Sequence, residues 1–179
     1  MSNDMSLKIK DITPLNLDEI PSPCISCLYW KDTSLIEKVT EDSARKVLKK
    51  EWLQDLLQKF GFVGKILYLE AKPIGCAFYG PFKAFPGIKS YGSIKAIPKE
   101  AFLACLYITS EEYRGRGFGR ALLKSVLEDL RKREFNAVYT FARRSSSNNP
   151  SGPLSLYLTE GFYVVDESIE DFPLVRKDL

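Results

Sequence analysis

The sequence predicts an α/β fold, with residues 1–179 forming a single domain in which helices flank a central mixed sheet. Its 179 residues are close to the size of one average domain and are enough to enclose a core. Residues 42–60 and 118–133 have the apolar spacing of amphipathic helices. The apolar segments 102–108 and 137–142 are typical of strands buried on both faces, which favours a sheet covered by helices on both sides.

The N-terminal part combines an extended lead-in with the first long helix. Residues 1–41 hold scattered prolines among polar residues, and we expect an extended segment with a first strand there. The aromatic run Cys27–Trp30 is typical of a further strand. In the helix at 42–60, which Gly61 should end, the apolar face comprises Ala44, Val47, Leu48, Trp52, Leu56 and Phe60, and the solvated face carries Lys46, Lys49 and Lys50.

Two strands and a long connection are expected next. Residues 65–71 and 74–79 should pair as a hairpin with Lys72-Pro73 at the turn. Residues 80–99 are rich in proline and glycine, and a loop of about 20 residues in a compact domain is more often functional than idle. Its aromatic side chains, which either cap a core or line a pocket, are Phe82, Phe85 and Tyr91.

The C-terminal half alternates strands and helices. The buried strand 102–108 leads into a glycine-rich stretch and the helix that ends near Arg133. After the strand at 137–142 we expect a polar loop at 145–152, a short helix at 154–160 and terminal strands at 162–165 and 174–177.

The composition narrows the chemistry. The chain has no histidine, so no Ser-His-Asp or Cys-His catalytic group, imidazole zinc site or histidine base can be built from it. A net charge of +3 with scattered basic residues gives no reason to expect a nucleic-acid partner. The sequence contains no run of 18 apolar residues, so we expect no membrane-spanning helix. Because the N-terminus lacks the apolar stretch of a signal peptide, we expect a cytoplasmic protein with reduced thiols.

The four cysteines do not form a metal pattern. Cys24 and Cys27 are spaced as C-x-x-C, but a zinc site would need two more ligands, and Cys76 and Cys105 lie singly within strand patterns. We therefore expect no metal and interpret these residues as buried or half-buried thiols. Cys105 is the one best placed to line an active site.

A glycine-rich loop between a buried strand and a helix is suited to hold phosphates. The first N–H groups of a helix lack partners within it, and the helix dipole favours an anion there. Gly115, Gly117 and Gly119 let the main chain turn tightly and approach a ligand, and arginines surround them. The spacing matches neither the dinucleotide fingerprint G-x-G-x-x-G nor the P-loop, and a pyrophosphate is the natural fit.

Two motifs together resemble one family. Arg114, Gly117 and Gly119 resemble the R/Q-x-x-G-x-G/A motif with which GNAT acetyltransferases bind acetyl-coenzyme A. About 40 residues further on, Tyr157 to Phe162 resembles the Tyr-x-x-x-Gly-Phe signature of the same family. The resemblance covers residues 62–166 and implies a GNAT-like fold, whose sheet is splayed near Ile108 to admit the coenzyme.

The resemblance implies an N-acetyltransferase that uses acetyl-coenzyme A as co-substrate. The residues implied to bind it are Leu106, Tyr107, Ile108, Arg114, Gly115, Arg116, Gly117, Phe118, Gly119, Arg120 and, by spacing, Asn149. An acceptor amine, of a small molecule or a peptide, would attack the thioester directly, with Tyr157 returning a proton to the thiolate. A homodimer is left open.

One departure from the family concerns the general base. The strand 102–108 has no acidic residue where many members carry a glutamate. Proton removal would then fall to water or to a carboxylate such as Glu70, Glu111 or Glu112. The same departure keeps a second hypothesis open, a catalytically silent sensor or regulatory module that binds coenzyme A.

Overall fold

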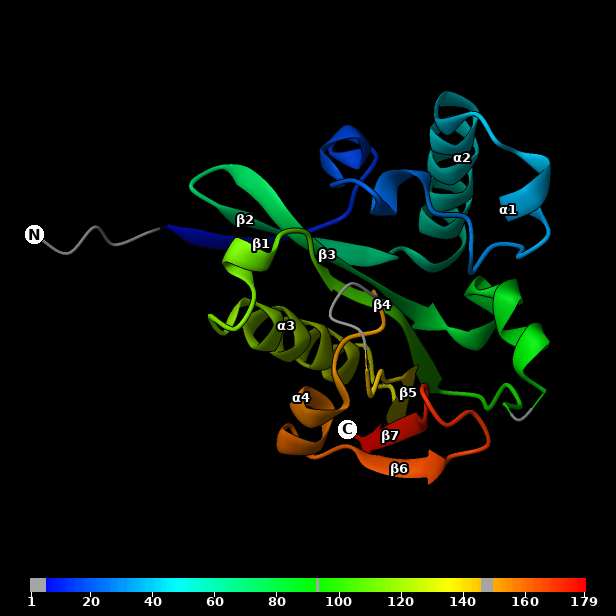
Figure 1. The fold of residues 1–179 in the computed structure, drawn as a ribbon, viewed down its shortest axis with the longest axis vertical. Helices are drawn as coiled ribbons and strands as arrows, with labels where there is room; N and C mark the ends of the chain where they lie inside the picture. Colours follow the sequence, from blue (N-terminus) through cyan, green and yellow to red (C-terminus); the bar gives the residue numbers. More distant parts are fainter. Residues whose placement is uncertain (1–5, 93, 146–149) are drawn as a thin grey trace, which may run out of the picture.

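The protein is built around one seven-stranded sheet (Figure 1). The structure, a computed structural model, describes residues 6–92, 94–145 and 150–179. The strands are β1 (Leu7–Asp11), β2 (Gly64–Leu69), β3 (Lys72–Pro81), β4 (Glu100–Ile108), β5 (Ala137–Phe141), β6 (Tyr163–Asp166) and β7 (Leu174–Asp178). The α-helices are α1 (Leu35–Lys38), α2 (Asp42–Phe60), α3 (Phe118–Lys132) and α4 (Leu154–Thr159). No helix in these ranges is both long enough and apolar enough to cross a membrane.

The sheet is mixed and is not closed, which confirms the predicted fold class. Its strands lie in the order β1-β2-β3-β4-β5-β7-β6. β4 and β5 pair in parallel, whereas the other neighbouring strands pair antiparallel. A parallel pair needs a crossover connection, and α3 forms it between β4 and β5.

The sheet separates two hydrophobic cores, with α2 on one face and α3 and α4 on the other (Figure 1). β4 contributes to both cores, because successive side chains of a strand point to opposite faces. Cys105 and Tyr107 belong to the α2 side, and Leu106 belongs to the α3 side. A ligand held beside β4 would therefore meet a different set of side chains on each face.

Helix α2 has the predicted bounds but buries a different face. It ends at Gly61, whose left-handed φ of +78° closes the last turn. Val47, predicted to be apolar core, is 56% exposed, and Lys49, predicted to be solvated, is only 4% exposed. The Lys49 ammonium donates to the Cys27 carbonyl at 2.9 Å and lies 4.2 Å from the centre of the Phe78 ring. These contacts replace water around the charge while the methylenes pack in the core.

The prediction of the β2–β3 turn is wrong by two residues. The turn residues are Glu70 and Ala71, with φ of +51° and +69°, and Leu69 pairs with Lys72. A two-residue hairpin of this kind needs positive φ at both central positions. Pro73 cannot adopt a positive φ, so it lies in β3 instead.

The predicted strand at Cys27–Trp30 is also absent. These residues follow the 3-10 helix Cys24–Ser26 and continue into a turn. Their carbonyl groups accept hydrogen bonds from separate parts of the chain rather than from one neighbouring strand. The Cys27 carbonyl accepts from the Lys49 ammonium, and the Trp30 carbonyl accepts from the N–H of Gly87 at 2.9 Å. The aromatic run is therefore an irregular segment that packs on the core.

The long connection at 80–99 caps the core on the α2 side. β3 extends through its first residues, and two 3-10 helices follow, Phe82–Ala84 and Pro86–Tyr91. Phe82 and Phe85 are buried, and Tyr91 packs 4.6 Å from Phe141 between ring centres. All three aromatic residues therefore cap the core, and Phe82 also lines a separate pocket, so both alternatives apply to it.

Candidate functional site

The candidate site lies where β4 and β5 diverge. Their parallel pairing is confined to residues 100–102 and 137–139. Beyond it, the segment before α4 lies between the strands. The N–H of Leu106 donates to the carbonyl of Pro150 at 2.7 Å, and the N–H of Arg143 donates to the carbonyl of Gly152 at 2.9 Å. At this point β4 therefore bonds to the segment before α4 instead of to β5.

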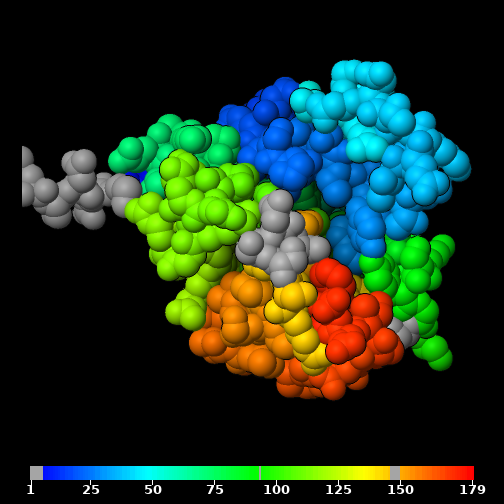
Figure 2. Space-filling model, viewed as in Figure 1, coloured from blue at the N-terminus to red at the C-terminus, as the bar shows by residue number. Residues whose placement is uncertain are grey.

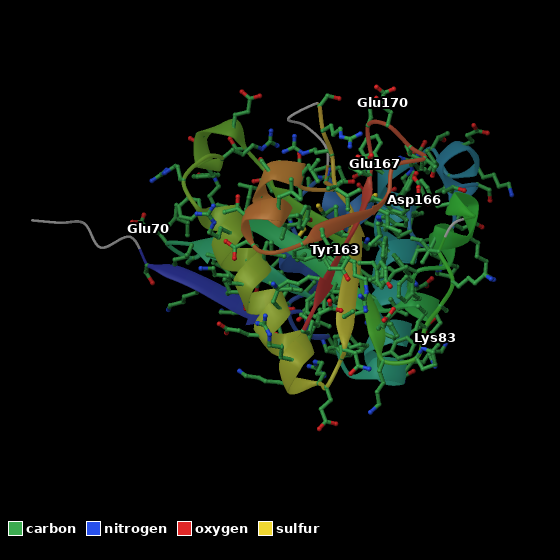
Figure 3. All side chains as sticks on the ribbon, turned by 90° about the horizontal axis from the view of Figure 1, so that it is seen from below. Glu70, Lys83, Tyr163, Asp166, Glu167 and Glu170 are labelled. Atoms are coloured by element: carbon green, nitrogen blue, oxygen red, sulfur yellow. The ribbon has the colours of Figure 1, made fainter. Side chains whose placement is uncertain are left out.

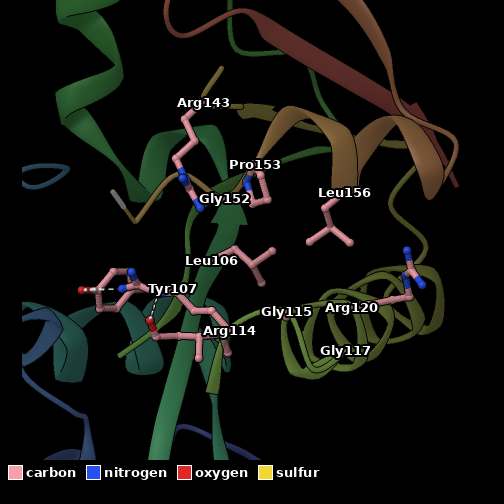
Figure 4. A pocket seen from close by; sticks show the side chains of 12 residues that line it. Leu106, Tyr107, Arg114, Gly115, Gly117, Arg120, Arg143, Gly152, Pro153 and Leu156 are labelled. Carbon is pink, nitrogen blue, oxygen red and sulfur yellow. Dashed lines mark hydrogen bonds between the residues drawn. The ribbon is translucent and has the colours of Figure 1, made fainter. Parts of the chain in front are cut away.

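A pocket of about 330 Å³ opens beside this split (Figure 4). Eight of the predicted binding residues line it: Leu106, Tyr107, Ile108, Arg114, Gly115, Gly117, Gly119 and Arg120. Four further lining residues were not predicted: Arg143, Gly152, Pro153 and Leu156. On the surface, the yellow-green segment before α3 adjoins the orange α4 (Figure 2). Asn149 lies outside the described residues.

The glycine-rich loop presents bare backbone to this pocket. Gly115 and Gly117 have φ of +71° and +85°, and a Cβ built on either one meets no atom within 4 Å. Gly117 is the N-cap of α3, so the unpartnered N–H groups of the first helical turn begin at Phe118. The positive end of the α3 dipole therefore faces unfilled space in the pocket. Helix N-termini of this kind are suited to bind phosphate groups.

The arginines of the loop and of the first turn of α3 have separate structural roles. Arg114 donates through Nε to the carbonyl of Ile108 at 3.0 Å and stacks over Tyr107, which holds the loop against the end of β4. Arg120 pairs with Glu160 at 2.9 Å and so connects α3 to the end of α4. Arg116 lies 5.2 Å over the ring of Phe118, and neither of these two residues is among those lining the pocket.

Tyr157 lies behind the pocket wall, fully buried. Its ring packs edge-on against Phe162, with 5.1 Å between ring centres, and its hydroxyl donates to the carbonyl of Ser151 at 3.0 Å. Gly152 touches the same ring: a Cβ there would lie 2.7 Å from the phenolic oxygen. Burial raises the pKa of Tyr157 well above its usual range.

The pocket is electropositive. Arg143 lies two residues beyond the end of β5, is half-buried, and lines the pocket opposite Arg114. Burial and the charge of Arg114 lower the pKa of Arg143, although a guanidinium still keeps its proton at neutral pH. Among the described residues that line the pocket, none carries a carboxylate. The one sequence signal for Arg143 is its position at the carboxyl end of a strand parallel to β4.

The cysteines lie away from the lining of this pocket. All four are free thiols, and Cys24, Cys76 and Cys105 are buried. Burial raises the pKa of Cys105 well above its usual range, so it remains a neutral thiol. Cys105, expected to line the active site, instead lies in the core on the α2 side. Within the residues that the structure describes, no group of side chains has the arrangement of a metal site.

Acidic residues gather at the end of β6 and on the β6–β7 connection, whereas Glu100, the acidic residue of β4, lies at the start of that strand and pairs with Arg176. Figure 3 shows Asp166, the last residue of β6, close to Glu167 and Glu170 of the connection, with Glu70 far away at the hairpin tip. This connection is held against the end of β5, because Arg144 pairs with Glu167 and donates to the carbonyl of Glu170 at 2.7 Å. The three carboxylates suggested by sequence, Glu70, Glu111 and Glu112, are all exposed and outside the pocket lining.

Comparison with known proteins identifies the family. The model of the acetyltransferase (GNAT) family matches residues 25–162, most of the chain. The protein therefore belongs to the GNAT acetyltransferase family and is an acyltransferase, as the two sequence motifs predicted. No curated protein matches the sequence at a significant level.

Solved structures share the fold over nearly the whole chain. PaiA N-acetyltransferase from Thermoplasma acidophilum, in complex with coenzyme A, has a TM-score of 0.60 at 18% identity and covers 98% of this chain and 100% of its own. The ribosomal-protein-alanine N-acetyltransferase from Brucella melitensis has a TM-score of 0.60 at 21% identity, covering 96% and 99%. The N-acetyltransferase YhbS from Escherichia coli, also with coenzyme A, has a TM-score of 0.55 at 18% identity, covering 98% and 84%. At these identities the similarity concerns the fold alone.

Proposed function

We propose that this acyltransferase is an N-acetyltransferase that transfers acetyl from acetyl-coenzyme A directly to a primary amine. One observation carries the proposal: a pocket in which the N-terminus of α3 meets the end of β4, where β4 no longer pairs with β5 (Figure 4). A pyrophosphate and an amide-bearing chain are the two features that such a pocket can bind at once. The coenzyme A bound by two relatives of the same fold supports the same donor here.

Each part of the donor has a counterpart in the pocket. The N–H groups at the start of α3 would bind the pyrophosphate, and Gly115 and Gly117 leave room for its approach. The residues Leu106 to Ile108 would run beside the pantetheine arm. In this structure the N–H of Leu106 donates to the carbonyl of Pro150. When the coenzyme binds, one of its own carbonyl groups would replace that of Pro150 as the acceptor. A main-chain N–H at this place could also polarise the thioester carbonyl.

Tyr157 is the proposed general acid. Its hydroxyl is held by Ser151, on the same short segment whose Pro150 caps Leu106. A shift of this segment on donor binding would therefore free the Leu106 N–H and the Tyr157 hydroxyl together. Proton removal from the amine falls to water or to a carboxylate outside the pocket lining.

The acceptor is proposed to be an amine of a small molecule or a peptide. The carboxylates of the β6–β7 connection, close to the end of β5, would attract a protonated amine before it loses its proton. Two relatives of the same fold are named as acting on ribosomal-protein alanine, which keeps peptide amines among the candidates.

Calorimetric titration with acetyl-coenzyme A, followed by an assay of thiol release with a panel of amines, tests the proposal. We expect binding, and thiol release that depends on an amine and is slowed in Tyr157→Phe while binding stays nearly intact. Absence of binding at millimolar ligand would refute the donor assignment. Binding without turnover for any amine would favour the alternative function, a regulatory module that binds coenzyme A.

A further inference from the structure

The main chain of Arg143 holds the short segment that contacts both the Leu106 N–H, through Pro150, and the Tyr157 hydroxyl, through Ser151. Its N–H donates to the carbonyl of Gly152 at 2.9 Å, and its own carbonyl accepts from the N–H of Leu154 at 2.9 Å. The main chain of Arg143 thereby holds the segment whose Ser151 carbonyl accepts from Tyr157. Its side chain lines the pocket and points toward Gly152 (Figure 4).

Two charged or titratable side chains act on the Arg143 guanidinium. Arg114 approaches from the glycine-rich loop, and Tyr157 approaches from α4. Arg114 repels it, whereas a negative charge on Tyr157 would attract it. Among the described residues that line the pocket, the charged ones are Arg114, Arg120 and Arg143, so the charged side chains of this wall are all positive.

The proposed reaction creates negative charge at this end of the pocket. When the amide forms, the carbon–sulfur bond breaks and its electron pair stays on sulfur. A buried phenol is a weaker acid than a thiol, so Tyr157 alone is poorly suited to neutralise that charge. A cation that faces both the sulfur and the phenol lowers the free energy of either anion, and it does so most strongly where water is excluded.

We propose that Arg143 is a catalytic residue that stabilises the departing thiolate and then the Tyr157 phenolate. The assignment rests on the proposed function, since it takes a coenzyme A thioester as the donor. The amine nitrogen attacks the thioester carbonyl and loses its proton to water or a carboxylate. Arg143 faces the sulfur as it gains the electron pair, Tyr157 transfers its phenolic proton to that sulfur, and the phenolate regains a proton from solvent.

The charge on bound coenzyme A provides a test that does not depend on turnover. The thiol of coenzyme A would be titrated in the complex through its ultraviolet thiolate absorbance, with the complex of desulfo-coenzyme A subtracted to remove the protein's own thiols and phenols. An opposite charge within about 4–6 Å lowers a pKa by roughly one to three units. We expect a shift of that size in the wild type, its loss in Arg143→Gln and its partial retention in Arg143→Lys.

Arg144→Gln is the matched control. Arg144 is the adjacent residue, is exposed, and pairs with Glu167 outside the pocket. This variant should keep the wild-type thiol pKa. A thiol in the wild-type complex that titrates as it does in free coenzyme A would overturn the assignment, without recourse to any variant. So would an equal shift in the wild type and Arg143→Gln. Failure of coenzyme A to bind at all would instead refute the proposed function, and the two failures are therefore distinguishable.

Discussion

Replacing Gly152 by alanine tests how Tyr157 is held. The φ of Gly152 is +70°, and a Cβ there would lie 2.7 Å from the phenolic oxygen and 3.1 Å from two ring carbons. Tyr157 is fully buried, so its ring has little room to retreat. A left-handed backbone costs an alanine about 1 kcal/mol, and overpacking at such contacts costs about 2 kcal/mol more. The expected loss of roughly 3 kcal/mol lowers the midpoint of thermal unfolding by about 6–12 °C for a chain of this length.

Gly115→Ala is the control that separates the two contributions. Its φ of +71° imposes the same backbone strain, but nothing lies within 4 Å of the added Cβ. It should cost only about 1 kcal/mol, or roughly 2–4 °C. Both variants can be followed by circular dichroism in heat and urea. If the two lose equal stability, the contact between Gly152 and Tyr157 does not constrain the protein as argued.

Three further predictions follow from other contacts. Gly117→Trp should fill the pocket and abolish binding of acetyl-coenzyme A in a calorimetric titration, because the indole would project into open space beside the start of α3. Lys49→Met should lower the free energy of unfolding in urea by about 1–3 kcal/mol, because it leaves the Cys27 carbonyl without its donor. Burial opposes the ionisation of Asp129, but hydrogen bonds from Arg133 and a tyrosine hydroxyl prevail and lower its pKa. The stability that Asp129 contributes is therefore present above its unfolded-state pKa and is lost as the pH falls through the lower folded value, so Asp129→Asn should show a shallower loss of stability in acid.

Each of these predictions has a matched control. Gly61→Trp places an indole at another left-handed, open position that ends α2, and it should leave donor binding unchanged. Val47→Ala removes an exposed side chain from the same helix as Lys49 and should cost less than about 0.5 kcal/mol. Glu128→Gln neutralises an exposed carboxylate beside Asp129 and should keep the wild-type acid profile. If a control variant changes the measured property as much as its test variant does, the role assigned to the corresponding residue is wrong.

The part of the site that the sequence predicted is continuous along the chain. Eight pocket residues lie in or beside one strand–loop–helix unit, whose apolar run, glycines and helix spacing are local signals. The same kind of signal defined α2, which ends at Gly61 as predicted. At Lys72-Pro73 the proline indicated a turn, but a two-residue hairpin turn needs residues with positive φ. Proline cannot adopt a positive φ, so the turn formed two residues earlier.

Only the tertiary structure places Arg143, Gly152 and Leu156 at the pocket, because the first two come from the segment that crosses from β5 to α4 and Leu156 comes from α4 itself. Lys49 is buried for a similar reason, since the carbonyl that receives its ammonium lies 22 residues earlier. By itself, the sequence determined the fold class, the family and the glycine-rich loop before α3, which depend on backbone conformation and periodicity within short stretches. The tertiary structure decided which charges face each other where the sheet splits. Such electrostatic and packing contacts join segments far apart in the chain, and no local sequence pattern indicates which segments come together.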